Sequence, residues 1–165
     1  MLVEMELREI IRGRDVAAIV LGEKHGANRE FPVYIDYIQA AALEMAVNGE
    51  QAPRPLTHDL VLNVVSGMGG TLKRIIVDKL VTDELGNGTF YAKLDIVRSD
   101  HSSAWIDARP SDAVVLASKL HLPIYVDEEV LREVKARPAE EAEGQEFEES
   151  EDDTADPGET EEEDT

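Results

Sequence analysis

The sequence predicts an α+β fold: a mixed, largely antiparallel sheet with helices packed on it, divisible into two related β–α units. Several short segments alternate apolar and polar residues, the pattern of a half-buried strand. Three longer segments place apolar residues at helical spacing behind a capping residue. The expected strands outnumber the helices and include hairpins, which favours helices packed on a mixed sheet.

The N-terminal third predicts three strands and a helix. The strands are expected at residues 3–10, 16–21 and 31–35. Asp36 is placed to cap the helix, and Gln39 closes a capping-box-like pair with it. Asn48–Gly49 ends the helix. The residues expected on its buried face are Ile38, Ala41, Ala42 and Met45.

A second helix is expected after a proline-bounded loop at residues 51–56. Thr57 is the natural N-cap, and Asp59 lies in the first turn. Glycines at 67, 69 and 70 end the helix. Its expected buried stripe consists of Leu60, Val61, Val64, Val65 and Met68.

The C-terminal half predicts a hairpin followed by further strands and helices. The expected strands are 72–81, 90–97, 104–107 and 123–126. The expected helices are 112–120, capped by Ser111, and a short one at 128–134. One face of the second hairpin strand carries Phe90, Ala92, Leu94 and Ile96.

A short repeated sequence pattern suggests how these elements are related. Tyr34–Ile35–Asp36 leads into an alanine-rich helix, and Trp105–Ile106–Asp107 leads into another. An aspartate between a strand and a helix is common capping chemistry, so this pattern by itself is a weak signal of an internal repeat. It predicts two β–α units that share one sheet.

The charge is distributed unevenly along the 165 residues. Residues 136–165 hold fifteen of the 36 acidic residues and one of the 16 basic ones, so they carry 14 of the 20 net negative charges. Such a segment buries too little apolar surface to fold. We expect one folded domain at residues 1–135 and a disordered acidic tail at 136–165. The tail either aids solubility, the simpler role, or mimics nucleic acid.

Composition excludes several classes of protein. The chain has no cysteine, which rules out disulfides, a thiolate nucleophile and cysteine-ligated metal sites. Its apolar runs are shorter than the roughly 18 residues that a membrane span needs. Its N-terminus fits no secretory signal, so we expect a soluble cytoplasmic protein. The acidic domain argues against strong nucleic-acid binding, unless Arg54, Lys73, Arg74 and Arg109 form a local basic patch.

Two polar segments are candidates for a functional site: residues 54–59 and residues 107–112. Each contains an Arg-Pro pair before a helix N-terminus, with an aspartate in or beside the first turn. Helix N-termini attract anions because their first N–H groups are unpaired. Both segments therefore fit the binding of a phosphate.

The functional interpretation joins the two segments into one site. Asp59, Asp107 and Asp112 offer the oxygen ligands that Mg²⁺ or Mn²⁺ prefers. His58 is a candidate general base or further ligand, and Arg54 and Arg109 can hold a phosphate. This set suits metal-assisted hydrolysis of a phosphodiester.

A structural interpretation explains the same residues without catalysis. Thr57, Asp59, Ser111 and Asp112 can simply cap helices, while Arg54 and Arg109 pair with the carboxylates across the two units. The segments then form a salt-bridge frame. Residue type alone favours this structural interpretation.

Five sequence blocks in order point to a family. They are Phe31-Pro32-Val33-Tyr34-Ile35, Arg54-Pro55-Leu56-Thr57-His58-Asp59-Leu60, Phe90-Tyr91-Ala92-Lys93-Leu94, Asp107-Ala108-Arg109-Pro110-Ser111-Asp112-Ala113 and Pro123-Ile124-Tyr125-Val126. Together they resemble the bifunctional nuclease domain family, named for DNase and RNase activity attributed to some members. The resemblance covers residues 2–134 and leaves out the tail.

This resemblance implies a nuclease acting on DNA or RNA. The short apolar runs predict no membrane partner, and the sequence is compatible with a homo-oligomer. Gln39 stands where the family carries Glu. If that Glu is a metal ligand, Gln39 weakens the site because it lacks the charge. If that Glu serves the capping box, Gln39 can do the same, and we favour this capping role. The alternatives to a nuclease are a non-catalytic interaction or regulatory module and a nucleotide-sensing domain.

Overall fold

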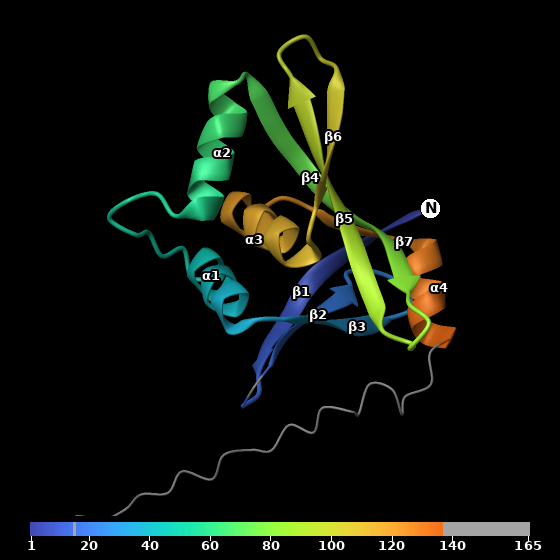
Figure 1. The fold of residues 1–165 in the computed structure, drawn as a ribbon. Helices are drawn as coiled ribbons and strands as arrows, with labels where there is room; N and C mark the ends of the chain where they lie inside the picture. Colours follow the sequence, from blue (N-terminus) through green and yellow to red (C-terminus); the bar gives the residue numbers. More distant parts are fainter. Residues whose placement is uncertain (15, 137–165) are drawn as a thin grey trace, which may run out of the picture.

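The computed structural model describes residues 1–14 and 16–136, and one seven-stranded sheet organises them (Figure 1). The strands are β1 Leu2–Arg12, β2 Ala17–Glu23, β3 Glu30–Ile35, β4 Gly70–Thr82, β5 Gly88–Arg98, β6 Ser103–Ala108 and β7 Ile124–Asp127. The helices are α1 Tyr37–Val47, α2 Thr57–Gly67, α3 Pro110–Leu120 and α4 Glu128–Ala136. Beyond Ala136, the predicted tail lies outside the described residues.

The strand order β3-β2-β1-β7-β4-β5-β6 is mirrored about β7. Only β4 and β7 run parallel; every other neighbouring pair is antiparallel. Each half is a three-stranded meander whose outermost strand, β3 or β6, leads directly into a helix, α1 or α3. These two helices pack on each other. The predicted α+β class and its two β–α units are therefore confirmed.

The sheet is strongly curved. Phe31 on β3 stacks on Phe90 of β5 with ring centroids 5.3 Å apart, although four strands separate β3 from β5 in the sheet. Helix α3 fills the concave side and contacts β3, β4 and β5. The predicted inward face of β5 is confirmed, since Ala92, Leu94 and Ile96 are buried. In Figure 1, α1, α2 and α3 gather at the left of the sheet, and α4 lies against β4 and β7 at the right.

The capping box of α1 is present, but its predicted buried face is wrong. The Gln39 N–H donates to Asp36 Oδ1 at 2.7 Å, and the Asp36 N–H donates to Gln39 Oε1 at 3.2 Å. The buried residues are Ala40, Leu43 and Ala46. Ile38 is instead 83% exposed. Small alanine side chains allow the close approach of α1 to α3, and this packing outweighs hydrophobicity in choosing the buried face.

The predicted stripe of α2 is also wrong, except at Val65. Leu60 is 57% exposed and Met68 is 83% exposed, and no residue of α2 is fully buried. Val65, which the predicted stripe includes, does pack against the core, and so does Leu62, which the stripe does not include. Apolar residues occupy most sides of this helix, so periodicity alone could not identify the packed side.

The two predicted N-caps are wrong by one or two residues. Leu56 is the N-cap of α2, and Arg109 is the N-cap of α3. Pro110 opens α3 because its missing N–H would have no helical partner at that position. Ser111 is buried within the first turn. None of the helices in the described ranges has both the length and the apolar character that a bilayer crossing requires.

Candidate functional site

The first turns of α2 and α3 meet at the carboxylate of Asp112. His58, the second residue of α2, places Nε2 3.1 Å from Asp112 Oδ1. Arg109 Nε donates to Asp112 Oδ2 at 2.7 Å, and Arg109 Nη2 donates to Oδ1 at 3.2 Å. The structure thus brings together three predicted site residues, one from the first polar segment and two from the second.

The charge of Asp112 is stabilised by its partners. Burial raises the pKa of Asp112, but the hydrogen bonds from Arg109 and His58 outweigh burial and hold the pKa below its ordinary value. The hydrogen bond to Asp112 in turn raises the pKa of Arg109. At neutral pH the centre of the cluster is therefore an ionised carboxylate that can orient an imidazole. The Arg109 side chain is 66% exposed, so the cluster is open to solvent on that side.

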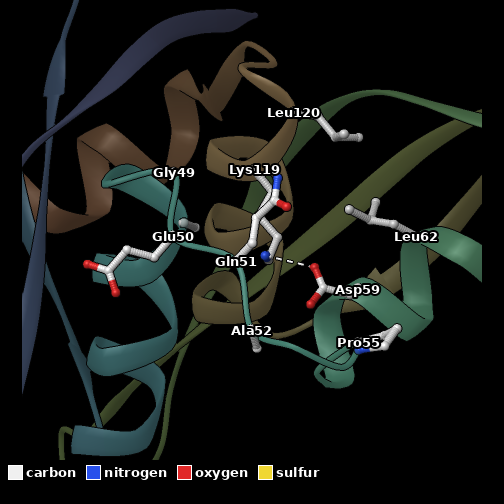
Figure 2. Close-up of a pocket in the computed structure, with 10 residues that line it drawn as sticks. Gly49, Glu50, Gln51, Ala52, Pro55, Asp59, Leu62, Lys119 and Leu120 are labelled. Atoms are coloured by element: carbon white, nitrogen blue, oxygen red, sulfur yellow. Dashed lines mark ion pairs between the residues drawn. The ribbon is translucent and has the colours of Figure 1, made fainter.

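Asp59 follows His58 in the chain but joins a different contact. Its Oδ1 lies 2.8 Å from Lys119 Nζ, and its Oδ2 accepts the N–H of Leu56 at 2.9 Å. The hydrogen bond from Lys119 is the main cause that lowers the pKa of Asp59. Figure 2 shows this ion pair beside a pocket of about 350 Å³ between the C-terminal ends of α1 and α3 and the start of α2.

Asp107 lies on β6 and faces away from the helices. It is exposed and stands opposite Lys93 of β5 in the strand register. The neighbours of Lys93, Ala92 and Leu94, point to the core, so Lys93 and Asp107 occupy the outer face of the sheet. The hydrogen bond to Asp78 raises the pKa of Lys93, and the charge of Asp107 adds to this effect.

Arg54 is exposed in the loop between α1 and α2 and forms no ion pair with any residue that the structure describes. Arg54 and Arg109 therefore do not form the predicted salt-bridge frame, which required both to pair with carboxylates across the two units. Arg109 binds Asp112 of its own helix, and contacts of His58 and Asp59 link α2 to α3 instead.

The three predicted metal ligands do not form one oxygen cluster. Asp59 and Asp112 are each bound to a basic side chain, and Asp107 lies on the other face of the sheet. Within residues 1–14 and 16–136 no group of three or more His, Asp or Glu side chains could hold a metal ion. Dependence on Mg²⁺ or Mn²⁺ stays a prediction, without a shared site built from these three residues.

Two of the four residues of the predicted basic patch, Arg74 and Arg109, belong to separate networks. Arg74 Nε donates to the buried Asp95 at 2.8 Å, and its guanidinium carbon lies 5.9 Å from the ring centre of Trp105 and 5.8 Å from that of Tyr125. Arg109 is held by Asp112 instead. Trp105 thus packs against an arginine, as a packing residue would, although its own surface is 49% exposed.

Sequence reasoning missed two relationships in this region, one made by Lys119 and one made by Asp36. Lys119 pairs with Asp59, but in the sequence it is simply a basic residue in the last turn of a helix, where it complements the helix dipole. Asp36 caps α1, and its charge also raises the pKa of Arg109, so the N-termini of α1 and α3 lie near each other. The packing of α3 against both α1 and α2 reveals these relationships.

Comparison with known proteins places this arrangement in a family. The model of the bifunctional nuclease domain matches residues 19–139. An uncharacterized protein of Mycobacterium tuberculosis (strain CDC 1551 / Oshkosh) is 40% identical over 114 residues, which cover 68% of this chain and 63% of that protein. The chain thus spans a little less than two thirds of the length of this relative.

Plant relatives are more distant. Bifunctional nuclease 1 of Oryza sativa subsp. indica is 25% identical over 139 residues, covering 79% of this chain and 41% of the plant protein. Bifunctional nuclease 1 of Arabidopsis thaliana is 28% identical over 112 residues, covering 67% and 33%. The match of the family model over most of the chain decides the assignment: this chain belongs to the bifunctional nuclease domain family.

Proposed function

We propose that this chain is a nuclease that hydrolyses phosphodiester bonds in DNA or RNA at the cluster of His58, Asp112 and Arg109. The observation that carries the proposal is the contact between His58 and Asp112 beside an exposed arginine at a helix N-terminus. Membership of the family supports the reaction class, as do the names of its plant relatives.

His58 is the general base in this proposal. When Nε2–H donates to Asp112, Nδ1 keeps its lone pair and can take a proton from water. The water oxygen that loses the proton attacks phosphorus, the bond from phosphorus to the leaving oxygen breaks, and a solvent water protonates that oxygen. Asp112 holds the imidazole in one tautomer and stabilises its protonated form, as the carboxylate of a catalytic triad does.

Arg109 is the phosphate-binding group. Its bonds to Asp112 use Nε and Nη2, which leaves Nη1 for a non-bridging phosphate oxygen. The first N–H groups of α3 add favourable partial positive charge at the same place. The substrate phosphate would thus bind beside His58, the base that activates the attacking water.

Mg²⁺ or Mn²⁺ is retained as a proposed cofactor. A divalent ion would neutralise charge on the phosphate and activate water. Because the predicted ligands Asp59, Asp107 and Asp112 do not gather at one point, no step of the mechanism above depends on an ion bound among them. Activity in EDTA, in Mg²⁺ and in Mn²⁺ tests the requirement directly.

One observation favours a second candidate, a non-catalytic interaction or regulatory module. The contacts of His58 with Asp112 and of Asp59 with Lys119 both attach α2 to α3, so the same residues can serve only to fix a helix. In that case their loss would change stability, with no activity to lose.

The deciding experiment measures cleavage of single-stranded DNA and RNA by the full chain, freed of contaminating nucleases, with each metal and with EDTA. We expect cleavage by the wild type and at least a tenfold loss in His58→Ala, with a local loosening of α2 and the rest of the fold intact. His25→Ala, a change of an exposed histidine outside the cluster, is the matched control. A wild-type protein that cleaves neither substrate under any condition would refute the nuclease proposal.

A further inference from the structure

The outer face of the sheet holds an arginine against two aromatic rings. Arg74 of β4 lies opposite Asp95 of β5, and Asp95 lies opposite Trp105 of β6. The two neighbours of Asp95 in β5 point to the core, so these three side chains occupy the outer face. The guanidinium carbon of Arg74 lies 5.9 Å from the ring centre of Trp105 and 5.8 Å from that of Tyr125.

Asp95 fixes this arginine at a cost in stability. Arg74 Nε donates to Asp95 Oδ2 at 2.8 Å. Asp95 is only 6% exposed, and its Oδ1 has no hydrogen-bond partner among residues 1–14 and 16–136. A buried carboxylate oxygen without a partner destabilises a fold. Stability alone therefore does not explain why the sheet holds a guanidinium at this place.

Arg74 and Trp105 present unused binding groups to solvent. Trp105 is 49% exposed, and the side chain of Arg74 is 38% exposed. Within the part of the chain that the structure describes, Arg74 bonds only through Nε, so Nη1 and Nη2 keep their donors. An exposed indole beside a guanidinium fits a ligand that combines a flat ring with an anion.

A second pair of the same kind lies on the same face. Lys79 of β4 lies opposite Tyr91 of β5, with its Nζ 5.8 Å from the centre of the tyrosine ring. Tyr91 is 40% exposed, and Lys79 is exposed as well. The outer face thus repeats the combination of an accessible ring and a cation.

We propose that Trp105 and Arg74 form a subsite for single-stranded nucleic acid, in which one base stacks on the exposed part of the indole and Arg74 binds the adjacent phosphate. Each nucleotide offers both a flat ring and an anion. In a single strand the base is free to stack on a side chain, whereas in a duplex it is stacked between its neighbours. This inference deepens the proposed nuclease function and rests on it for the class of ligand.

Strand β6 connects this subsite to the proposed active site. It is the outermost strand of its half of the sheet and leads directly to Arg109, the proposed phosphate-binding group. Four residues of extended chain separate Trp105 from Arg109 and cover about 13 Å, a distance that a short oligonucleotide can span. A strand bound at Arg109 can therefore continue along β6 to Trp105.

Charge does not supply the affinity of this subsite. The chain has a net charge of −20, and Asp107 is exposed on β6 between Trp105 and Arg109. Both features oppose a polyanion. Stacking of a base on an aromatic ring does not depend on net charge, so the base and not the phosphate provides most of the binding.

Trp105 is the one tryptophan of the chain, so its fluorescence reports directly on the subsite. The full chain carrying His58→Ala, held in EDTA to prevent cleavage, is titrated with oligothymidylate while the emission is recorded. We expect saturable quenching, because the stacked base contacts the indole. A duplex of the same length and an abasic strand with the same number of phosphates are the matched probes, and both should quench little. Equal quenching by the abasic strand would overturn the inference.

Fluorescence anisotropy of a dye-labelled oligothymidylate measures the contribution of the ring in the same His58→Ala background. Trp105→Ala should weaken binding at least about fivefold, and Trp105→Phe, which keeps a ring, should lose less. Tyr34→Ala is the matched control, since Tyr34 is 45% exposed on β3, the other edge strand, and should leave binding unchanged. Equal affinities for Trp105→Ala and Tyr34→Ala would contradict the subsite.

Failure of this inference is distinguishable from failure of the proposed function. Cleavage by the wild type without quenching in the titration would remove the subsite and keep the nuclease. Quenching without cleavage under any condition would keep the subsite and remove the nuclease. Emission that no single strand changes would overturn the inference and leave the outer face to a protein partner.

Discussion

His58 and Asp112 are 54 residues apart in the chain, yet the imidazole Nε2 lies 3.1 Å from the carboxylate Oδ1. The contact joins the first turn of α2 to the first turn of α3. The next residue of α2, Asp59, reaches Lys119 in the last turn of α3. Helix α2, which has no fully buried side chain, is thus held by two polar contacts with α3 and by the packing of Leu62 and Val65 against the core.

Lys119→Met should loosen α2 while leaving the rest of the fold intact. The side chain of Lys119 is 17% exposed and that of Asp59 is 30% exposed, so their ion pair is partly shielded from water. We expect the backbone amides of α2 to exchange with solvent roughly fivefold faster, equivalent to about 1 kcal/mol, because one of two anchors is lost. Hydrogen exchange followed by mass spectrometry measures this change.

Lys24→Met is the control for that experiment. Lys24 pairs with Glu4 at 2.7 Å on the surface, with side chains 45% and 33% exposed. Exposed pairs contribute little to stability, so this variant should match the wild type. Unchanged exchange of α2 in Lys119→Met would show that apolar packing alone positions the helix.

Arg29→Met should lower the melting temperature more than any other single ion-pair variant named here. Arg29 Nη2 lies 2.6 Å from Oε1 of Glu23, a residue only 4% exposed, and Arg29 Nη1 lies 2.8 Å from Glu128 Oε1 on α4. Removing the guanidinium leaves a buried carboxylate without its partner, which is far more costly than losing an exposed pair. Arg12→Met, which breaks the exposed pair with Glu44, is the matched control. Equal melting temperatures for the two variants would contradict this expectation.

The same arginine should set part of the pH dependence of stability. Hydrogen bonds from Arg29 lower the pKa of Glu23 in the folded protein, so this group stabilises the fold above its unfolded pKa of about 4.3. That contribution is lost as pH falls through the lower folded value. In Arg29→Met, burial instead favours the protonated form of Glu23. Urea unfolding at neutral pH and at about pH 4 should therefore show the stability difference between wild type and variant narrowing in acid.

The strands were predictable because their determinants are local. Alternation along β5 correctly identified Ala92, Leu94 and Ile96 as inward-facing, and the side chains of Asp36 and Gln39 correctly indicated the start of α1. Helix faces depend on long-range packing instead. The close approach of α1 to α3 turns Ala40 and Ala46 inward, and the hydrophobic pattern of the sequence does not predict this buried face.

The candidate site was predictable in its parts but not in its connections. Two helix N-termini rich in Arg and Asp indicated the meeting of His58, Arg109 and Asp112. The partner of Asp59 is Lys119, which lies on a different helix far along the chain, and no local sequence pattern predicts such a pair. Asp107 belongs to a strand, so the two-residue period directs it to the outer face, away from its predicted partners.

Asp107 and Asp112 belong to the same polar segment, and replacing each with asparagine should have different effects. Asp112→Asn should reduce nuclease activity by at least about tenfold, because an amide can neither fix the tautomer of His58 nor stabilise its protonated form. The fold should survive, since Arg109, the other partner of Asp112, is 66% exposed and can be solvated. Asp107→Asn, on the outer face of the sheet, should leave activity close to that of the wild type. The metal-ligand hypothesis differs here, because it predicts a large loss of activity for both variants and partial rescue by raised Mg²⁺ or Mn²⁺.

Cleavage rates across a metal titration, together with melting temperatures, separate the base–carboxylate hypothesis from the metal-ligand hypothesis. A loss confined to Asp112→Asn would support the base–carboxylate cluster, equal losses would restore Asp107 as a ligand, and an unchanged rate in Asp112→Asn would remove the cluster from the reaction.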